Sequence, residues 1–185
     1  MKSSNNINTK FKRTGFASSK TIAISLIAAV GLFTGCEPNS FTLRMPPKFA
    51  EIDCEGTNFV AKGIDTNGTT IAGKVENQNA RLKNTSPEFW EICVKRALEK
   101  KGYQFVSSKD IVSISKLKGR LLRFKYQSQK GDYIYLIAMF KQPGQKPVFL
   151  TEAGGLRKNI SKTLESEIID CFRTISIEHD SRKGN

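Results

Sequence analysis

The sequence predicts an α+β domain in which helices cover a mainly antiparallel sheet, arranged as an α/β/α sandwich. Short runs typical of strands come first, a helix pattern follows, and further strands and a second helix pattern complete the chain. The run 133–140 is apolar almost throughout, which indicates an inner strand covered on both faces. With 185 residues, of which 38% are hydrophobic and 25% charged, the chain has the composition of a globular protein.

Strands are predicted in the first part of this domain. Residues 41–45 alternate between apolar and polar side chains, and Pro46-Pro47 ends the run. Residues 57–64 and 69–75 flank Asn67-Gly68, a dipeptide that readily adopts the positive φ angles of a tight turn. We therefore expect these two runs to pair as an antiparallel hairpin.

A helix is predicted to follow Ser86, because Ser86 can serve as its N-cap, Pro87 fits its first turn and Glu88 lies near the positive end of its dipole. Gly102 is expected to end this helix. Glu91 and Lys95 have the spacing of an i,i+4 ion pair. The apolar stripe expected to face the core comprises Trp90, Cys93, Val94, Ala97 and Leu98.

The second half of the domain is predicted to contain strands and a final helix. Short strands are expected at 103–106, 111–114 and 148–152, and longer ones at 120–126 and 133–140. In the run 120–126, Leu122, Phe124 and Tyr126 share one face, and Arg123 and Lys125 share the other. The final helix, near 159–175, has a stripe of Ile160, Leu164, Ile168, Cys171 and Ile175.

The N-terminal segment has the features of a secretory signal peptide. Residues 1–20 contain five lysines and arginines and no acid, and residues 21–35 are uncharged and rich in apolar residues. The apolar run is shorter than the roughly 20 residues that a membrane-spanning helix needs. An uncleaved N-terminal membrane anchor is the alternative.

This segment ends in Leu32-Phe33-Thr34-Gly35-Cys36, which resembles the lipobox of bacterial lipoproteins, with Phe33 in place of the usual aliphatic residue. The resemblance implies acyl chains on Cys36, and several acyl chains hold a protein stably on a membrane. In enteric lipoproteins an Asp directly after the lipidated cysteine favours retention in the inner membrane, so the same resemblance implies that Glu37 directs the protein to the outer membrane, with a periplasm-facing domain. The expected organisation is a lipoprotein signal peptide at 1–35, a lipidated tether at 36–40, a domain at 41–177 and a polar tail at 178–185.

Several motifs of the domain resemble the PsbP-like family, which includes PsbP, Mog and DcrB-type lipoproteins. In chain order they are F-T-L-R-M-P-P-K-F at 41–49, S-P-E-F-W at 86–90, K-K-G-Y at 100–103, G-R-L-L-R-F at 119–124, Y-I-Y-L-I-A-M-F at 133–140 and E-A-G-G at 152–155. The resemblance covers residues 41–175 and implies an α/β/α sandwich. It also implies a role in binding or assembling other proteins, here envelope proteins or the membrane surface, and it carries no shared catalytic residues.

Catalytic chemistry has little support in the sequence. The one histidine, His179, lies in the polar tail, where a precise catalytic geometry is hard to hold. Glu51 and Asp53 are interpreted as solvated loop acids, and the cysteine and histidine spacing does not suggest a metal site. We expect neither an enzyme nor a cofactor. The alternative is a solute-binding or enzymatic lipoprotein with a cleft near Gly154-Gly155, a pair that can cradle an anion when it precedes a helix.

Three cysteines would remain after lipidation of Cys36, so at most one internal disulfide can form. Cys93 and Cys171 lie on the stripes of two helices that are expected to cover opposite faces of the sheet. Bonded cysteines have Cα atoms within about 7 Å of each other, so these two could not meet. Cys54 with Cys171 is therefore the predicted pair.

The segment 116–130 contains six lysines and arginines and no acid. Arg123 and Lys125 are predicted to form part of a surface for an anionic partner, either lipid headgroups or an acidic protein, because the short tether would hold the domain beside the bilayer. A solvated face that only keeps the protein soluble is the alternative. Nucleic acid is not an expected partner outside the cytoplasm.

Overall fold

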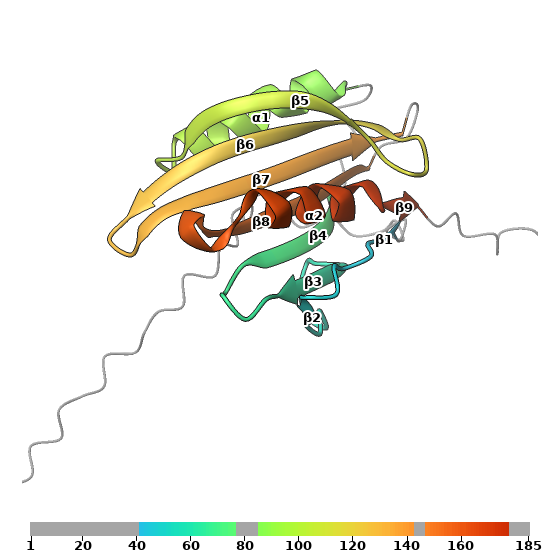
Figure 1. Ribbon diagram of the computed structural model, residues 1–185. Coiled ribbons are helices and arrows are strands. Elements are labelled where there is room, and N and C mark those ends of the chain that lie inside the picture. The colour runs from blue at the N-terminus through green and yellow to red at the C-terminus, as the bar shows by residue number, and fades with distance from the viewer. Residues whose placement is uncertain (1–40, 77–84, 143–146, 178–185) are drawn as a thin grey trace, which may run out of the picture. The chain divides into compact units, whose positions relative to one another are not determined.

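An antiparallel sheet of seven strands is the centre of the part of the chain that the computed structural model describes, residues 41–76, 85–142 and 147–177 (Figure 1). The strands lie in the order β2 (Ala50–Glu51), β3 (Ala61–Ile64), β4 (Thr70–Glu76), β8 (Val148–Leu156), β7 (Gly131–Lys141), β6 (Lys118–Ser128) and β5 (Gln104–Val112). Every neighbouring pair in this order is antiparallel.

Two helices cover opposite faces of this sheet, α1 (Pro87–Glu99) and α2 (Lys162–Arg173), as Figure 1 shows. A single turn of 3-10 helix, η1 (Arg157–Asn159), precedes α2. Two short strands, β1 (Phe41–Thr42) and β9 (Ser176–Ile177), pair antiparallel beside the sheet. This arrangement confirms the predicted α+β class and the three-layer sandwich.

Strand β7 is buried on both faces, as its apolar sequence predicts. Its alternate residues Ile134, Leu136, Ala138 and Phe140 join one core with α2. Tyr135, Ile137 and Met139 point to the other face, where α1 packs against β5, β6 and β7. The sheet therefore separates two cores, each closed by one helix.

The predicted hairpin is present as β3 and β4, with Ile64 paired with Thr70 across the turn. Asp65 stabilises this turn, because its Oδ1 accepts hydrogen bonds from the backbone N–H groups of Asn67 (2.9 Å) and Thr69 (2.7 Å). Gly68 has φ +78°, a conformation that glycine adopts at little cost.

Helix α1 begins as predicted, with the Ser86 hydroxyl accepting a hydrogen bond from Phe89 N. The predicted Glu91–Lys95 pair is wrong. Glu91 instead accepts from Arg120 on β6 at 2.7 Å, and Lys95 Nζ lies 4.2 Å from the centre of the Phe105 ring. The apolar stripe is also narrower than predicted, since Ala97 is exposed. Contacts between α1 and the sheet determine the partner of Glu91 and the width of the buried stripe, and these contacts cannot be deduced from helical spacing alone.

Several strand boundaries differ from the prediction. The predicted runs 103–106 and 111–114 belong largely to one strand, β5. A bulge between Phe105 and Ser107 interrupts the alternation of side chains along this strand, and the sequence pattern therefore divides into two short runs. Of the run 41–45, only residues 41–42 are a strand. Strand β8 extends to Leu156, well beyond the predicted end at 152. The polar tail predicted at 178–185 lies outside the described residues.

Candidate functional site

The structure describes only some of the predicted site residues. Cys36, Glu37 and His179 lie outside the described residues. Cys54, Arg123, Lys125, Cys171 and the Gly154-Gly155 pair all lie within them.

The described cysteines are free thiols, so the predicted Cys54–Cys171 disulfide is absent. Cys54 lies in the loop between β2 and β3, where its Sγ donates to Ile52 O at 3.5 Å. Cys171 is instead buried in the core beneath α2, and this burial raises the pKa of its thiol to about 12. The prediction failed because helical spacing places Cys171 in the core without showing which residues surround it there.

The Gly154-Gly155 pair does not form the turn before a helix that the sequence suggested. Both glycines lie inside β8, where Gly154 pairs with Thr70 and Tyr135 on the two sides. A methyl group added at Gly155 would lie 3.0 Å from Thr69 Oγ1. These glycines therefore permit close packing of the sheet, and they do not precede a helix in the way that anion binding requires.

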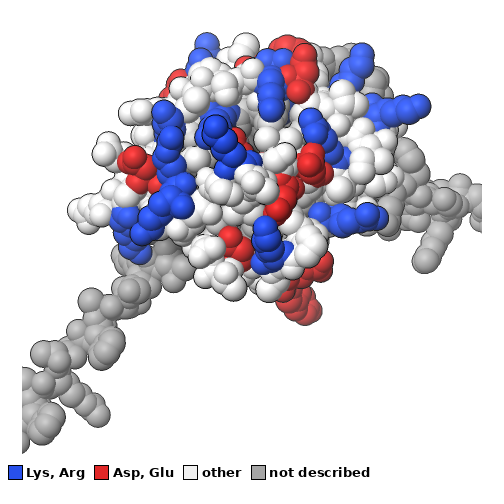
Figure 2. All heavy atoms as spheres, viewed as in Figure 1, with Lys and Arg blue, Asp and Glu red and all other residues white. Residues whose placement is uncertain are grey.

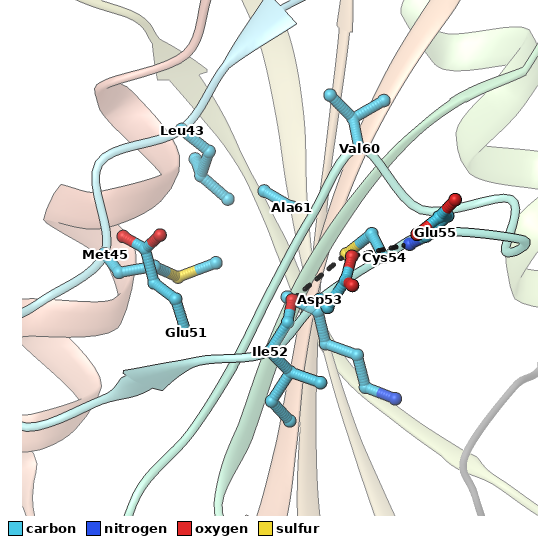
Figure 3. Close-up of a pocket in the computed structure, with 10 residues that line it drawn as sticks. Leu43, Met45, Glu51, Ile52, Asp53, Cys54, Glu55, Val60 and Ala61 are labelled. Atoms are coloured by element: carbon cyan, nitrogen blue, oxygen red, sulfur yellow. Dashed lines mark hydrogen bonds between the residues drawn. The ribbon is translucent and has the colours of Figure 1, made fainter.

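A cavity of about 350 Å³ lies beside the loop that joins β2 and β3 (Figure 3). Its lining includes Glu51, Asp53 and Lys62 beside the apolar Leu43 and Ala61. Asp53 Oδ1 accepts a hydrogen bond from Glu55 N at 2.9 Å, so this carboxylate shapes the loop. A second cavity, of about 360 Å³, lies between the β6–β7 turn and η1, with Lys130, Arg157 and Lys158 among its lining residues.

The six positive residues of 116–130 divide into paired and unpaired groups. Arg120 bonds to Glu91 and to Asp110, and Arg123 Nη1 lies 2.5 Å from Glu165 Oε1 of α2. The predicted alternation of β6 is correct, but the face that carries Arg123 is covered by α2 at this point. The exposed lysines of the segment form no ion pair with another described residue: Lys116, Lys118, Lys125 and Lys130.

Acidic side chains accompany the basic ones over the face of the molecule on which α2 lies. Figure 2 shows Lys and Arg beside Asp and Glu on this face, without one continuous basic patch. The predicted anionic-partner surface therefore has only one unpaired member at its named positions, Lys125, and Arg123 has an internal partner.

A buried polar group lies on the α1 side of the sheet. Tyr135 donates a hydrogen bond to Glu152 Oε2 at 2.5 Å, and both side chains are buried. Burial raises the pKa of Glu152, although the Tyr135 hydrogen bond and the charge of Lys74 act in the opposite direction. Burial likewise raises the pKa of Tyr135 well above its ordinary value. Burial thus disfavours the charged form of this carboxyl, which suits a structural hydrogen bond better than attraction of a cation.

The turn between β5 and β6 exposes apolar side chains. Val112 is 52% exposed and Ile114 is 74% exposed, next to the exposed Lys116 and Lys118. We call residues 112–118 the β5–β6 tip. A backbone hydrogen bond joins this tip to the C-terminal end of α2, since Ile114 N donates to Arg173 O at 2.7 Å.

Comparison with known proteins bears on the fold. No protein-family model matches the sequence, and no curated protein matches it. The solution structure of cyanobacterial PsbP from Synechocystis aligns with a TM-score of 0.52 and 8% identity over 80% of this chain and 99% of that chain. The crystal structure of LpqN from Mycobacterium tuberculosis, a protein involved in cell envelope biogenesis, aligns with a TM-score of 0.52 and 15% identity over 77% and 87%.

The chain has a PsbP-like fold. This likeness confirms the architecture that the sequence motifs imply. At 8% and 15% identity the likeness extends to the fold alone.

Among the described residues, no three His, Cys, Asp or Glu side chains form a group that could hold a metal ion. The same residues contain no helix of the length and apolar character that a membrane span requires.

Sequence reasoning missed the β5–β6 tip, although a signal for it is present. In I-V-S-I, residues 111–114, alternation places Ile111 on one face and the apolar Val112 and Ile114 on the other. The structure buries Ile111 and exposes the other two. Two large apolar residues on an exposed face, followed closely by lysines, are the pattern that could have marked this feature.

Proposed function

We propose that the protein is a lipid-anchored, non-catalytic binding or assembly factor of the bacterial cell envelope. One structural observation supports a binding role most directly: the exposed β5–β6 tip combines large apolar side chains with unpaired lysines. The anchor rests on the basic and apolar leader and on the lipobox that ends at Cys36.

The structure gives less support to the rival proposal, a solute-binding or enzymatic lipoprotein with a cleft near Gly154-Gly155. The Gly154-Gly155 pair is inside the sheet, and Asp53, one of the carboxylates that line the cavity beside the β2–β3 loop, is engaged by the backbone of that loop. A ligand site would need several polar groups converging on an enclosed apolar space. A binding surface on the outside of the domain accounts better for the exposed tip.

The proposed compartment is the envelope, with the domain facing the periplasm and Glu37 favouring the outer membrane. LpqN, which shares the fold, is involved in cell envelope biogenesis, and an envelope role for this chain agrees with its leader sequence. The proposed partners are the membrane and an envelope protein.

Substitution of Cys36 tests the anchor. In the Cys36→Ser variant we expect an unprocessed precursor that incorporates no fatty-acid probe, because the thiol that accepts the lipid is missing. The Cys54→Ser variant is the matched control, since this thiol is partly exposed in a loop and should leave labelling unchanged. Normal labelling of Cys36→Ser would overturn the anchor. Fractionation of the two membranes then tests the outer-membrane assignment, which recovery with inner-membrane markers would reverse.

A further inference from the structure

The β5–β6 tip holds its exposed apolar residues in a defined conformation. Ser113 N donates to Leu117 O at 3.0 Å, and the Ser113 hydroxyl accepts from Leu117 N at the same distance. Ile111 and Leu117, on the two sides of the tip, are buried in the core beneath α2. The outward position of Ile114 is therefore fixed by the fold, and its exposure is not that of a loose loop.

The tip lies at the end of the domain where the chain from Cys36 enters it. Ile114 N bonds to Arg173 O, Arg44 N bonds to Thr174 Oγ1, and Phe41 pairs with Ile177. All three contacts fall on the segment 173–177, whose four residue steps span at most about 14 Å. Figure 1 shows β1 and β9 beside the turn that joins β5 to β6.

The predicted lipid is confined to the same neighbourhood. Only four residues separate Cys36 from Phe41, and fully extended they reach about 14 Å. An acylated Cys36 would hold the β1–β9 end of the domain close to the bilayer. The tip is hydrogen-bonded to the same end of the domain, so it would also lie close to the membrane surface.

The chemistry of the tip suits a lipid headgroup region. Val112 and Ile114 can enter the boundary between headgroups and acyl chains, while Lys116 and Lys118 remain at the level of anionic headgroups. Arg44, exposed at the same end, adds a positive charge. The nearby carboxylate of Asp170 is engaged by Arg173 at 2.8 Å.

We propose that the β5–β6 tip inserts Val112 and Ile114 into the surface of the bilayer that holds the acylated Cys36. This inference rests on the proposed lipid anchor. It adds a second membrane contact, made by the domain itself, which would fix the orientation of the sheet relative to the membrane.

Tryptophan fluorescence in vesicles tests the contact. The acylated full chain is reconstituted into vesicles of phosphatidylethanolamine and phosphatidylglycerol with or without brominated acyl chains, which quench tryptophan only on close approach. For Ile114→Trp we expect at least a twofold loss of the added fluorescence in brominated vesicles. Ile92→Trp is the matched control, because Ile92 is 51% exposed on α1, on the other face of the sheet from β1, and it should show no loss. The unsubstituted chain supplies the Trp90 background.

The outcomes separate this inference from the anchor on which it rests. Acyl groups are detected by mass spectrometry, and attachment is measured by flotation with the vesicles. A chain that is acylated and floats, but whose Trp at position 114 is quenched no more than the Trp at position 92, overturns the membrane contact and leaves the anchor intact. A chain without acyl groups that neither floats nor shows quenching overturns both.

Discussion

Glu152 is a carboxyl group that the folded chain holds at 5% exposure in the middle of the sheet. Its folded pKa is raised by burial above the ordinary value of 4.5, so the folded state binds more protons than the unfolded state above that pH. The stability linked to this proton is fully present below about pH 4.5. It is lost as the pH rises from there through the raised pKa of the folded state.

Replacing Glu152 with Gln should remove this pH dependence. Gln keeps the shape and an acceptor for Tyr135, and it has no charge to desolvate. Relative to Glu152→Gln, we expect the free energy of unfolding of the wild type to decrease between pH 4.5 and pH 7, as measured by urea denaturation. Glu55→Gln, at an exposed loop carboxylate, should leave the pH dependence of the free energy of unfolding as it is in the wild type. An equal pH dependence of the free energy of unfolding for Glu152→Gln and the wild type would show that folding does not raise the pKa of Glu152.

Arg123 and Lys125 share one face of β6 but differ in their surroundings. The Arg123 side chain is 30% exposed and pairs with Glu165, whose side chain is 16% exposed. Arg123→Gln leaves this carboxylate without its charged partner, and we expect a loss of about 1–2 kcal/mol, discounted for partial exposure. Lys125→Gln should change the free energy of unfolding by less than about 0.5 kcal/mol. Equally small losses for the two variants would show that the Arg123–Glu165 pair adds nothing to stability.

At the scale of the elements, α1 presents an inner and an outer apolar residue for comparison. Leu98 is 2% exposed, whereas Ile92 is 51% exposed. Leu98→Ala should lower the free energy of unfolding by about 2–5 kcal/mol, because it removes packing from the core between α1 and the sheet. Ile92→Ala should cost less than about 0.5 kcal/mol, since that side chain already faces solvent. Similar losses in urea denaturation would mean that the buried face of α1 is misassigned.

Elements whose signals are local could be predicted from the sequence. Asn67-Gly68 marked the β3–β4 turn, Ser86-Pro87 marked the start of α1, and the apolar run marked β7. The features that failed depend on neighbours distant in the sequence. The bulge in β5 depends on its pairing with β6. The Gly154-Gly155 pair resembles a turn in the sequence, but it lies in a strand that pairs with β4 on one side and β7 on the other. The residues that contact Glu91, Arg123 and Cys171 are likewise determined by the tertiary structure.

At the scale of the whole molecule, the sheet is shared by two cores that do not mix. Ile168 of α2 is fully buried on one side, and Leu98 of α1 is buried on the other. Both cores pack against β5, β6 and β7, so loss of one core should expose strands that support the other. Such sharing predicts one cooperative unfolding transition for the domain, in spite of its two layers of packing.

The same geometry predicts how substitutions combine. Leu98→Ala and Ile168→Val lie on opposite faces of the sheet, so their losses in free energy of unfolding should add to within about 0.5 kcal/mol. The pair Ile168→Val and Phe172→Leu is the control, because these residues are one turn apart on α2 in a single core and should depart from additivity by more than that. Urea denaturation followed by fluorescence and by circular dichroism should give one coincident transition for every variant. A Leu98→Ala/Ile168→Val variant that unfolds in two steps, or that deviates from additivity as strongly as the control pair, would show that the two cores are not joined only through the sheet.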